Sequence, residues 1–240
     1  SAGNCNESNI IDGINWCVDD SSIFNITVIS MSLGSTSLYS SQCDGSFSLM
    51  AAAVDAAIAK NISVVAAAGN DGSTTGITSP ACIKNVTSVG WTNKDNTISA
   101  DSNRNSITDL LAPGSSITSL ANGGGPTENS GTSMSTPHVS AAFALIHQYF
   151  KLTENKVVMP NETQRYLNNT GKRITDSGGS GLTFSRINIF EAIKSLDNLA
   201  PTINVTFSYP SNNSITSNKS IFVNISSTEV LSVALLEING

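Results

Sequence analysis

Apolar residues recur at helical spacing in some stretches of the chain and form short β-branched runs in others. The two patterns alternate from the N-terminus to about residue 200. Helical spacing predicts helices at 6–20, 46–60, 132–150, 161–168 and 187–196. The β-branched runs predict buried strands at 26–34, 61–70, 85–91 and 107–114. Strands that alternate with helices indicate an α/β fold, in which helices cover both faces of a parallel sheet.

Two of the predicted helices show a candidate end or a candidate face. Ser8 is a plausible N-cap for the first helix, since serine accepts a hydrogen bond from the first turn. In the helix at 46–60 one side carries apolar residues, which predicts that this side faces the core. These residues are Phe47, Met50, Val54 and Ile58.

The pattern changes near Ala200, where short alternating strands with Asn/Ser turns replace the helical period. These strands are expected at 202–210, 220–228 and 230–240. They resemble the start of a β-sandwich, but about 40 residues are too few for an immunoglobulin-like module of roughly 100. We therefore expect one domain over 1–199 and a truncated β-sandwich module over 200–240.

Composition narrows the classes of partner and the compartment. The net charge is −6 and no basic run is present, which argues against a nucleic-acid partner. No apolar stretch approaches the roughly 20 residues of a membrane span. The low charged fraction of 12% and the many Asn-x-Ser/Thr triplets suit an extracellular or cell-surface protein. The triplets begin at Asn6, Asn25, Asn61, Asn85, Asn161, Asn168, Asn204, Asn212, Asn218 and Asn224.

Three segments carry candidate chemistry. NSGTSMSTPHVSAA (129–142) places Ser133 where a glycine-led loop enters a helix, at the positive end of the helix dipole. VVAAAGN (64–70) ends a buried strand at Asn70, whose amide is a natural donor to an oxyanion. VISMSLGS (28–35) ends another strand in small residues whose backbone could pair with an extended peptide.

Together these segments resemble the subtilase family of serine proteases over about residues 8–196. The family's nucleophile motif stands here as GTSMSTPHV, its oxyanion motif as AAAGN and its substrate strand as SLG. The resemblance implies a subtilisin-like sheet, polypeptide substrates, and Ser133 as the nucleophile that forms an acyl-enzyme. The Asn70 amide and the Ser133 N–H would bind the oxyanion. The substrate-binding residues would be Ser32, Leu33 and Gly34 on one side of the cleft, Ala67, Ala68 and Gly69 on the other, and Thr78 near the floor of an uncharged S1 pocket.

One departure from the family pattern bears directly on activity. Subtilases supply the triad Asp and His earlier in the chain, in D-[ST]-G and H-G-T-H contexts, and this sequence has neither. His138 is the histidine of the P-H-V motif and is not the base, while His147 reads as a core or surface residue. Two explanations stay open: the sequence begins partway through the catalytic domain, which we favour, or the protein naturally lacks its base.

The resemblance also places the cysteines. Cys43 follows SLG and Cys82 precedes the TSVG strand, so both loops should lie at the same edge of the sheet, and we expect a Cys43–Cys82 disulfide. Cys5 and Cys17 bracket a predicted helix and would lie about 18 Å apart, which is too far for a mutual bridge.

Three functions compete at this point. The first is a secreted subtilisin-like endopeptidase, and the second is an inactive subtilase that binds peptides or serves in adhesion at the cell surface. The third, an esterase of the α/β-hydrolase class, is disfavoured because Met134 and Ser135 follow Ser133 in place of a G-x-S-x-G elbow. The residues indicate no metal site or cofactor. Many subtilases bind calcium, and the resemblance leaves calcium open, with its principal ligand loops expected upstream.

Overall fold

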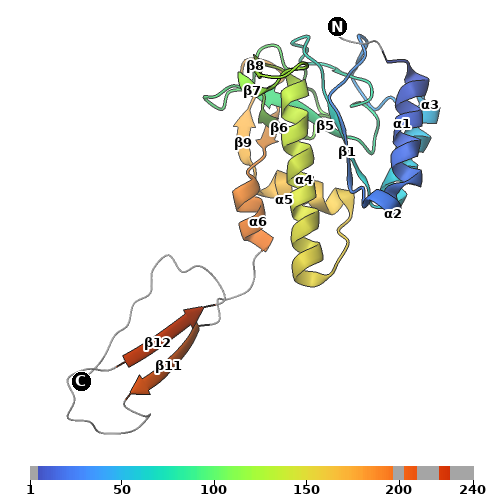
Figure 1. Cartoon of the computed structure of the whole chain (residues 1–240). Helices are drawn as coiled ribbons and strands as arrows, with labels where there is room; N and C mark the ends of the chain where they lie inside the picture. The colour runs from blue at the N-terminus through green and yellow to red at the C-terminus, as the bar shows by residue number, and fades with distance from the viewer. Residues whose placement is uncertain (1–4, 197–202, 210–221, 228–240) are drawn as a thin grey trace. The chain divides into compact units, whose positions relative to one another are not determined.

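The structure, a computed structural model, describes residues 5–196, 203–209 and 222–227. The chain divides into two compact units, Ser1–Leu196 and Asp197–Gly240. The first unit holds the sheet, the long helices and the segments with candidate chemistry (Figure 1).

The first unit is built on a sheet with the strand order β1-β3-β5-β6-β10-β9. Neighbouring strands from β1 to β10 are parallel, and β9 is antiparallel to β10. The strands are β1 (Val28–Met31), β3 (Ser63–Ala67), β5 (Thr87–Thr92), β6 (Leu110–Pro113), β9 (Lys172–Thr175) and β10 (Thr183–Arg186). The predicted parallel sheet is therefore confirmed, with the addition of two strands that the sequence did not predict: β10, parallel to β6, and β9, antiparallel at the edge.

Helices cover both faces of this sheet, as the sequence predicts. The helices α1 (Glu7–Asp19) and α3 (Ser48–Ala59) contribute to one apolar core. The helices α4 (Thr132–Glu154), α5 (Pro160–Thr170) and α6 (Ile189–Leu196) contribute to the other. In Figure 1 α4 runs lengthwise over the sheet, while α1 and α3 lie together on the side of β1. The short α2 (Ser21–Phe24) leads into β1.

Strand β3 shows why the buried runs have no polar alternation. Val64 and Ala66 belong to the core beneath α1 and α3, whereas Val65 belongs to the core beneath α4. All residues of β3 are buried, because a central parallel strand has a helical layer on each side. On α3 the predicted face is confirmed: Met50 and Val54 are buried, and Phe47 and Ile58 pack against the same core.

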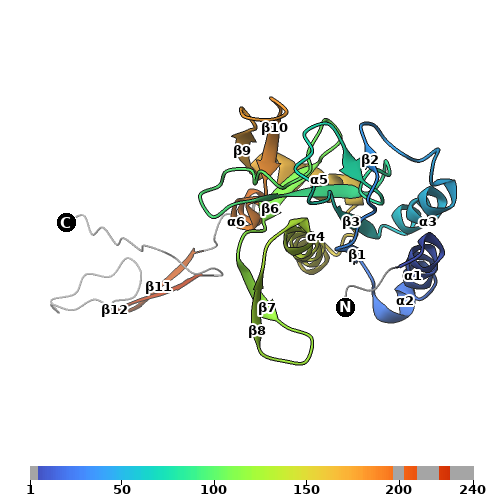
Figure 2. The same ribbon diagram turned by 90° about the horizontal axis from the view of Figure 1, so that it is seen from above.

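The element ends differ from the predictions in several places. The first helix is capped at Asn6 without a side-chain hydrogen bond, so Ser8 lies inside the first turn and the predicted cap is wrong. Two further strand pairs are absent from the predictions. They are β2 (Leu38–Tyr39) with β4 (Ile77–Thr78) and the hairpin of β7 (Ile117–Leu120) with β8 (Pro126–Asn129). Figure 2 shows the hairpin projecting beside the N-terminal end of α4.

The predicted disulfide between Cys43 and Cys82 is present, with 5.4 Å between the two Cα atoms. It closes the loop after β1 onto the segment before β5, and the backbone N–H of Cys43 also donates to the carbonyl of Cys82 at 3.0 Å. Cys5 and Cys17 are both free thiols, in line with the expectation that they do not bridge each other.

The second unit contains an antiparallel pair of strands, β11 (Ile203–Tyr209) and β12 (Phe222–Ser227). Both lie within strands that the sequence predicts. The third predicted strand, 230–240, lies outside the described residues. A β-sandwich module in this unit, and a domain boundary at residue 199, therefore stay predictions.

Candidate active site

Ser133 lies at the carboxyl edge of the sheet, where the ends of β1 and β3 meet the start of α4. Gly131 is the N-cap of α4 with φ 142°, and Ser133 is half-buried in the first turn of the helix. A side chain at Gly131 would crowd the Asn70 amide at 3.2–3.4 Å, so glycine permits the close approach. The first-turn N–H groups of such a helix point toward any anion bound there.

Ser133 is tied to the end of β1 by a reciprocal pair of hydrogen bonds. The Ser133 hydroxyl donates to the carbonyl of Ser32 at 3.3 Å, and the Ser32 hydroxyl donates to the carbonyl of Ser133 at 2.9 Å. Both histidines are engaged elsewhere. His138 Nδ1 lies 2.8 Å from the Met134 carbonyl, and His147 Nε2 lies 3.4 Å from the Ser63 hydroxyl.

The amide of Asn70 is oriented by Thr132. Asn70 Oδ1 accepts hydrogen bonds from the Thr132 backbone N–H at 2.8 Å and from the Thr132 hydroxyl at 2.9 Å. Two donors on the oxygen fix which end of the amide carries the NH₂ group. Within the described residues Asn70 Nδ2 has no hydrogen-bond partner, so it remains available as a donor next to Ser133.

A cavity of about 200 Å³ opens between these residues. Its lining comprises Leu33, Gly34, Ser35, Ala67, Gly69, Asn70, Asp71, Thr78, Thr132 and Ser133. Most of the predicted site residues therefore converge on one small cavity, although they come from four separate segments. Ser32 lies outside the lining and contacts Ser133 through the hydrogen bonds above. Ala68 is fully buried behind the cavity, where its carbonyl accepts the N–H of Thr78 at 2.9 Å.

Thr78 is buried under the wall that Gly34 forms. A side chain at Gly34 would lie 2.6 Å from the Thr78 hydroxyl oxygen, so this wall requires glycine. The structure adds Asp71, a lining residue that sequence reasoning missed, whose carboxylate accepts a hydrogen bond from Asn103 Nδ2 at 3.0 Å. Its position directly after Asn70 was the available signal. The expectation of an uncharged S1 pocket stays a prediction.

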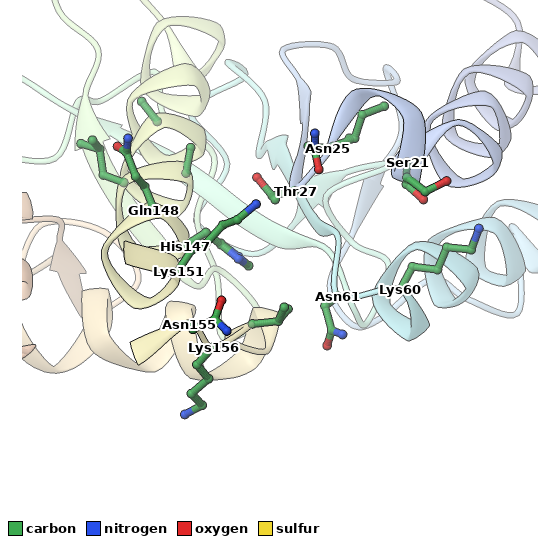
Figure 3. Close-up of a pocket in the computed structure, with 16 residues that line it drawn as sticks. Ser21, Asn25, Thr27, Lys60, Asn61, His147, Gln148, Lys151, Asn155 and Lys156 are labelled. Atoms are coloured by element: carbon green, nitrogen blue, oxygen red, sulfur yellow. The ribbon is translucent and has the colours of Figure 1, made fainter. Parts of the chain in front are cut away.

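A larger groove of about 1100 Å³ lies along α4 and the start of β1, away from the carboxyl ends of the strands (Figure 3). Figure 3 shows His147, Gln148 and Lys151 reaching it from α4, and Thr27 and Asn25 from the β1 side. Its apolar lining includes Ile26, Ala141, Ala144, Leu145 and Val157. Within the described residues β1 pairs with β3 alone, so its other edge borders this side of the molecule. Burial lowers the pKa of His147 below its ordinary value.

Among the described residues, no three His, Cys, Asp or Glu side chains gather closely enough to hold a metal ion. In the same part of the chain, no helix has the length and apolar character needed to cross a membrane.

A mainly parallel α/β sheet with a serine at a helix N-terminus and an oriented amide beside it defines a serine-hydrolase type of site. Comparison with known proteins then identifies the family. The model of the subtilase family matches residues 1–186, so the chain belongs to the subtilase family.

Individual relatives agree with this assignment. The chain is 40% identical over 149 residues to subtilisin E of Bacillus subtilis (strain 168), covering 61% of this chain and 36% of the relative. It is 40% identical over 142 residues to subtilisin-like protease 1 of Arthroderma otae, covering 58% of this chain and 27% of the relative. A solved structure of a cold adapted subtilisin-like serine proteinase superposes with a TM-score of 0.63 at 32% identity, covering 78% of this chain and 63% of the other. The matched part thus spans 36% and 27% of the two curated relatives and 63% of the solved structure.

Proposed function

We propose that this chain is the C-terminal part of the catalytic domain of a secreted subtilisin-like serine endopeptidase. The observation that carries the proposal is the arrangement of Ser133 and Asn70 around Thr132. Thr132, which directly precedes Ser133, holds the Asn70 oxygen through two hydrogen bonds. Within the described residues these bonds leave the Asn70 NH₂ group without a partner. Membership of the subtilase family supports the same reaction class.

In this proposal Ser133 Oγ attacks the scissile carbonyl carbon while a general base removes the hydroxyl proton. The negative charge that develops on the carbonyl oxygen is accepted by the Ser133 backbone N–H and Asn70 Nδ2. The amine leaves after receiving the proton from the base, and water then hydrolyses the acyl-enzyme. The start of α4 adds a favourable field at the oxyanion, because its N-terminal end is partly positive.

The substrate is proposed to be a polypeptide bound in extended form. Ser32, Leu33 and Gly34 continue directly from β1, so their backbone can pair with a substrate strand. The side chain that precedes the cleaved bond would enter the cavity of about 200 Å³ between Gly34 and Gly69. Lining by Gly34, Ala67 and Gly69 favours an uncharged side chain at this position.

The general base and its carboxylate are proposed to lie in a segment upstream of Ser1. Two features of the first unit support this. Ser133 is bonded to the end of β1, and the outer edge of β1 has no strand partner within the described residues. The apolar groove along α4 borders the same side, so a segment that pairs with β1 would cover the groove and end beside Ser133.

Compartment and calcium belong to the same proposal. An extracellular or cell-surface location is supported by the Cys43–Cys82 disulfide, because such bonds persist mainly in oxidising compartments. Calcium, which the family resemblance leaves open, is retained only as a proposal for the complete protein.

A second candidate is an inactive homologue that binds peptides or takes part in adhesion. It is favoured by one observation: both histidines of the sequence bond to groups other than Ser133. A serine without its base keeps only the residual catalysis of the oxyanion site and of binding.

Covalent labelling with a fluorophosphonate probe tests the two candidates in the full-length protein. We expect Ser133 to be labelled and the Ser133→Ala variant to be unlabelled. Ser130→Ala is the matched control, because Ser130 is an exposed serine three residues away whose hydroxyl only accepts the N–H of Ser116. Absence of label on Ser133 in the folded full-length protein would reject the protease and leave the inactive homologue.

A further inference from the structure

Asn103 is a fully buried side chain behind the loop that carries Asn70, and it is not part of the cavity lining. Its Oδ1 accepts hydrogen bonds from the backbone N–H groups of Asp71 at 3.0 Å and Ser73 at 2.9 Å. Its Nδ2 donates to the Ala68 carbonyl at 3.2 Å and to an Asp71 carboxylate oxygen at 3.0 Å. A side-chain amide has two acceptor sites and two donor hydrogens, and here all of them are used on one short segment.

These contacts fix the backbone on both sides of Asn70. The backbone N–H of Asn103 donates to the Gly69 carbonyl at 3.0 Å, directly before Asn70, and its side chain holds the Asp71 N–H directly after it. Among the described residues Asn70 itself is held only through Oδ1, by Thr132. The direction of Asn70 Nδ2 therefore depends on how its two neighbours are fixed.

The packing between Asn103 and the loop is close. Gly69 has a φ of +107°, and a side chain there would collide with Asn103 Nδ2 and with the Thr78 methyl group. Glycine permits both this backbone conformation and this approach. The loop therefore packs directly against Asn103 and Thr78 at Gly69.

Asn103 is in turn held by a rigid neighbour. Arg104 forms a buried, bidentate ion pair with Asp176, with the shorter N–O distance at 2.8 Å. Its guanidinium also donates to the Ser102 carbonyl at 2.9 Å, and its backbone N–H donates to the Ser73 carbonyl at 2.8 Å. These contacts hold in place the segment that carries Asn103.

We propose that Asn103 is a positioning residue for the oxyanion-binding amide. It holds the backbone before and after Asn70 so that Nδ2 is aimed at the developing oxyanion before substrate arrives. It does not touch the substrate, and it acts only through Asn70. This inference rests on the proposed function, in which Asn70 stabilises the oxyanion.

The test is a double-mutant cycle between Asn103 and Asn70 in the full-length protein. We expect Asn103→Ala to lower kcat by about 10- to 100-fold with KM changed by no more than about 3-fold, because the loss falls on the transition state. We expect no further loss of kcat when Asn103→Ala is added to Asn70→Ala, because the donor that it positions is already gone. An undiminished loss in the Asn70→Ala background would overturn the proposal, as would an unchanged kcat in the single variant.

Asn105→Ala is the matched control for damage to the same buried segment. Asn105 is also buried, but its amide donates to the carbonyls of Tyr39, Ser40 and Thr75 and makes no hydrogen bond to residues 68–73. Its effect on kcat should be small and should be the same with and without Asn70. A non-additive effect at Asn105 equal to that at Asn103 would show a general loss of structure and contradict the proposal.

Hydrogen exchange provides a readout that does not need activity. In Asn103→Ala the backbone amides of Asp71 and Ser73 lose their acceptor, so we expect exchange in 69–73 to become about 10-fold faster or more while β3 stays protected. Unchanged exchange in 69–73 would overturn the positioning role even if the wild type cleaves no peptide. Failure of Ser133 to react with a fluorophosphonate, by contrast, would reject the proposed function and leave the exchange result to decide the role of Asn103.

Discussion

The first unit has two hollows that differ in size and in how the polar groups that line them are held. The cavity beside Ser133 measures about 200 Å³, and the groove along α4 measures about 1100 Å³. In the small cavity the polar groups are fixed by one another, as when Thr132 orients Asn70. In the groove two of the three lysines are engaged elsewhere: Lys60 donates to the Val18 carbonyl at 2.8 Å, and the Lys156 amine lies 5.2 Å from the centre of the Phe150 ring.

This difference indicates what each hollow does. Catalysis requires donors that are already oriented toward one point, and volume alone does not supply them. The groove has apolar walls beside the edge of β1 that has no strand partner within the described residues. Such a surface suits contact with a protein segment better than a reaction. Substitutions in the cavity should therefore change activity and leave stability constant. Substitutions in the groove should change stability and leave the activity per folded molecule constant.

The substitution Ser133→Ala tests this comparison most directly. If Ser133 is the nucleophile, peptidase kcat of the full-length protein should fall by the order of a millionfold. The melting temperature should change little, because the hydroxyl is half-buried and makes only one long hydrogen bond, of 3.3 Å. Peptide hydrolysis and thermal unfolding on the same sample check both halves. A loss of activity of less than about tenfold would place the chemistry elsewhere.

Asn70→Ala is expected to have the next largest effect. Loss of one oxyanion donor lowers kcat by about 100- to 1000-fold and leaves KM nearly unchanged, because the donor acts mainly in the transition state. Steady-state kinetics on a peptide substrate measure the two parameters separately. Thr74→Ala is a suitable control, since Thr74 belongs to the same loop region but does not line the cavity. A rise in KM at constant kcat would make Asn70 a ground-state binding residue.

The sequence was most informative where a local pattern determines local structure. The β-branched run at 61–70 predicts a buried strand, and β3 is buried throughout. The short motif around Ser133 predicts the start of a helix, and α4 begins at Thr132. These features depend on neighbouring residues, so the printed sequence contains most of what determines them.

The remaining features depend on contacts between distant segments. Asn103 and Ala68 are 35 positions apart, and nothing in either segment predicts that the Asn103 amide uses all of its own hydrogen-bonding sites on that loop. The first cap was assigned to Ser8 from residue type alone, whereas the helix starts at Glu7. The β7–β8 hairpin was missed because its tip is a run of glycines with positive φ, which reads as a plain loop.

The groove should respond to Leu145→Asp through stability. Leu145 lines the groove at 45% exposure, and a segment that covers it in the full-length protein would bury it further. We expect the free energy of unfolding to fall by about 1–3 kcal/mol, because a carboxylate would replace apolar contacts. Leu152→Asp on the same helix is the matched control: Leu152 is 76% exposed outside the groove, and its substitution should cost about 0.5 kcal/mol or less. Equal, small losses in both variants would mean that the groove remains open to solvent.

The smallest expected effect concerns His147, at the wall of the groove. Burial lowers the pKa of His147 in the folded protein, whereas in the unfolded chain it takes up a proton near its ordinary value of about 6.5. The unfolded state therefore binds more protons below that pH, so stability from the neutral ring is present above about pH 6.5 and is lost as the pH falls through the folded pKa. The facing group on β3 is the neutral Ser63 hydroxyl, and the charged Lys60, Lys151 and Lys156 line the same groove. Urea unfolding at pH 8 and pH 5 should show a smaller loss of stability for His147→Gln than for the wild type, with peptidase activity per folded molecule unchanged. An identical loss in both proteins would mean that His147 gains its proton without cost, and hence that this wall of the groove is wet.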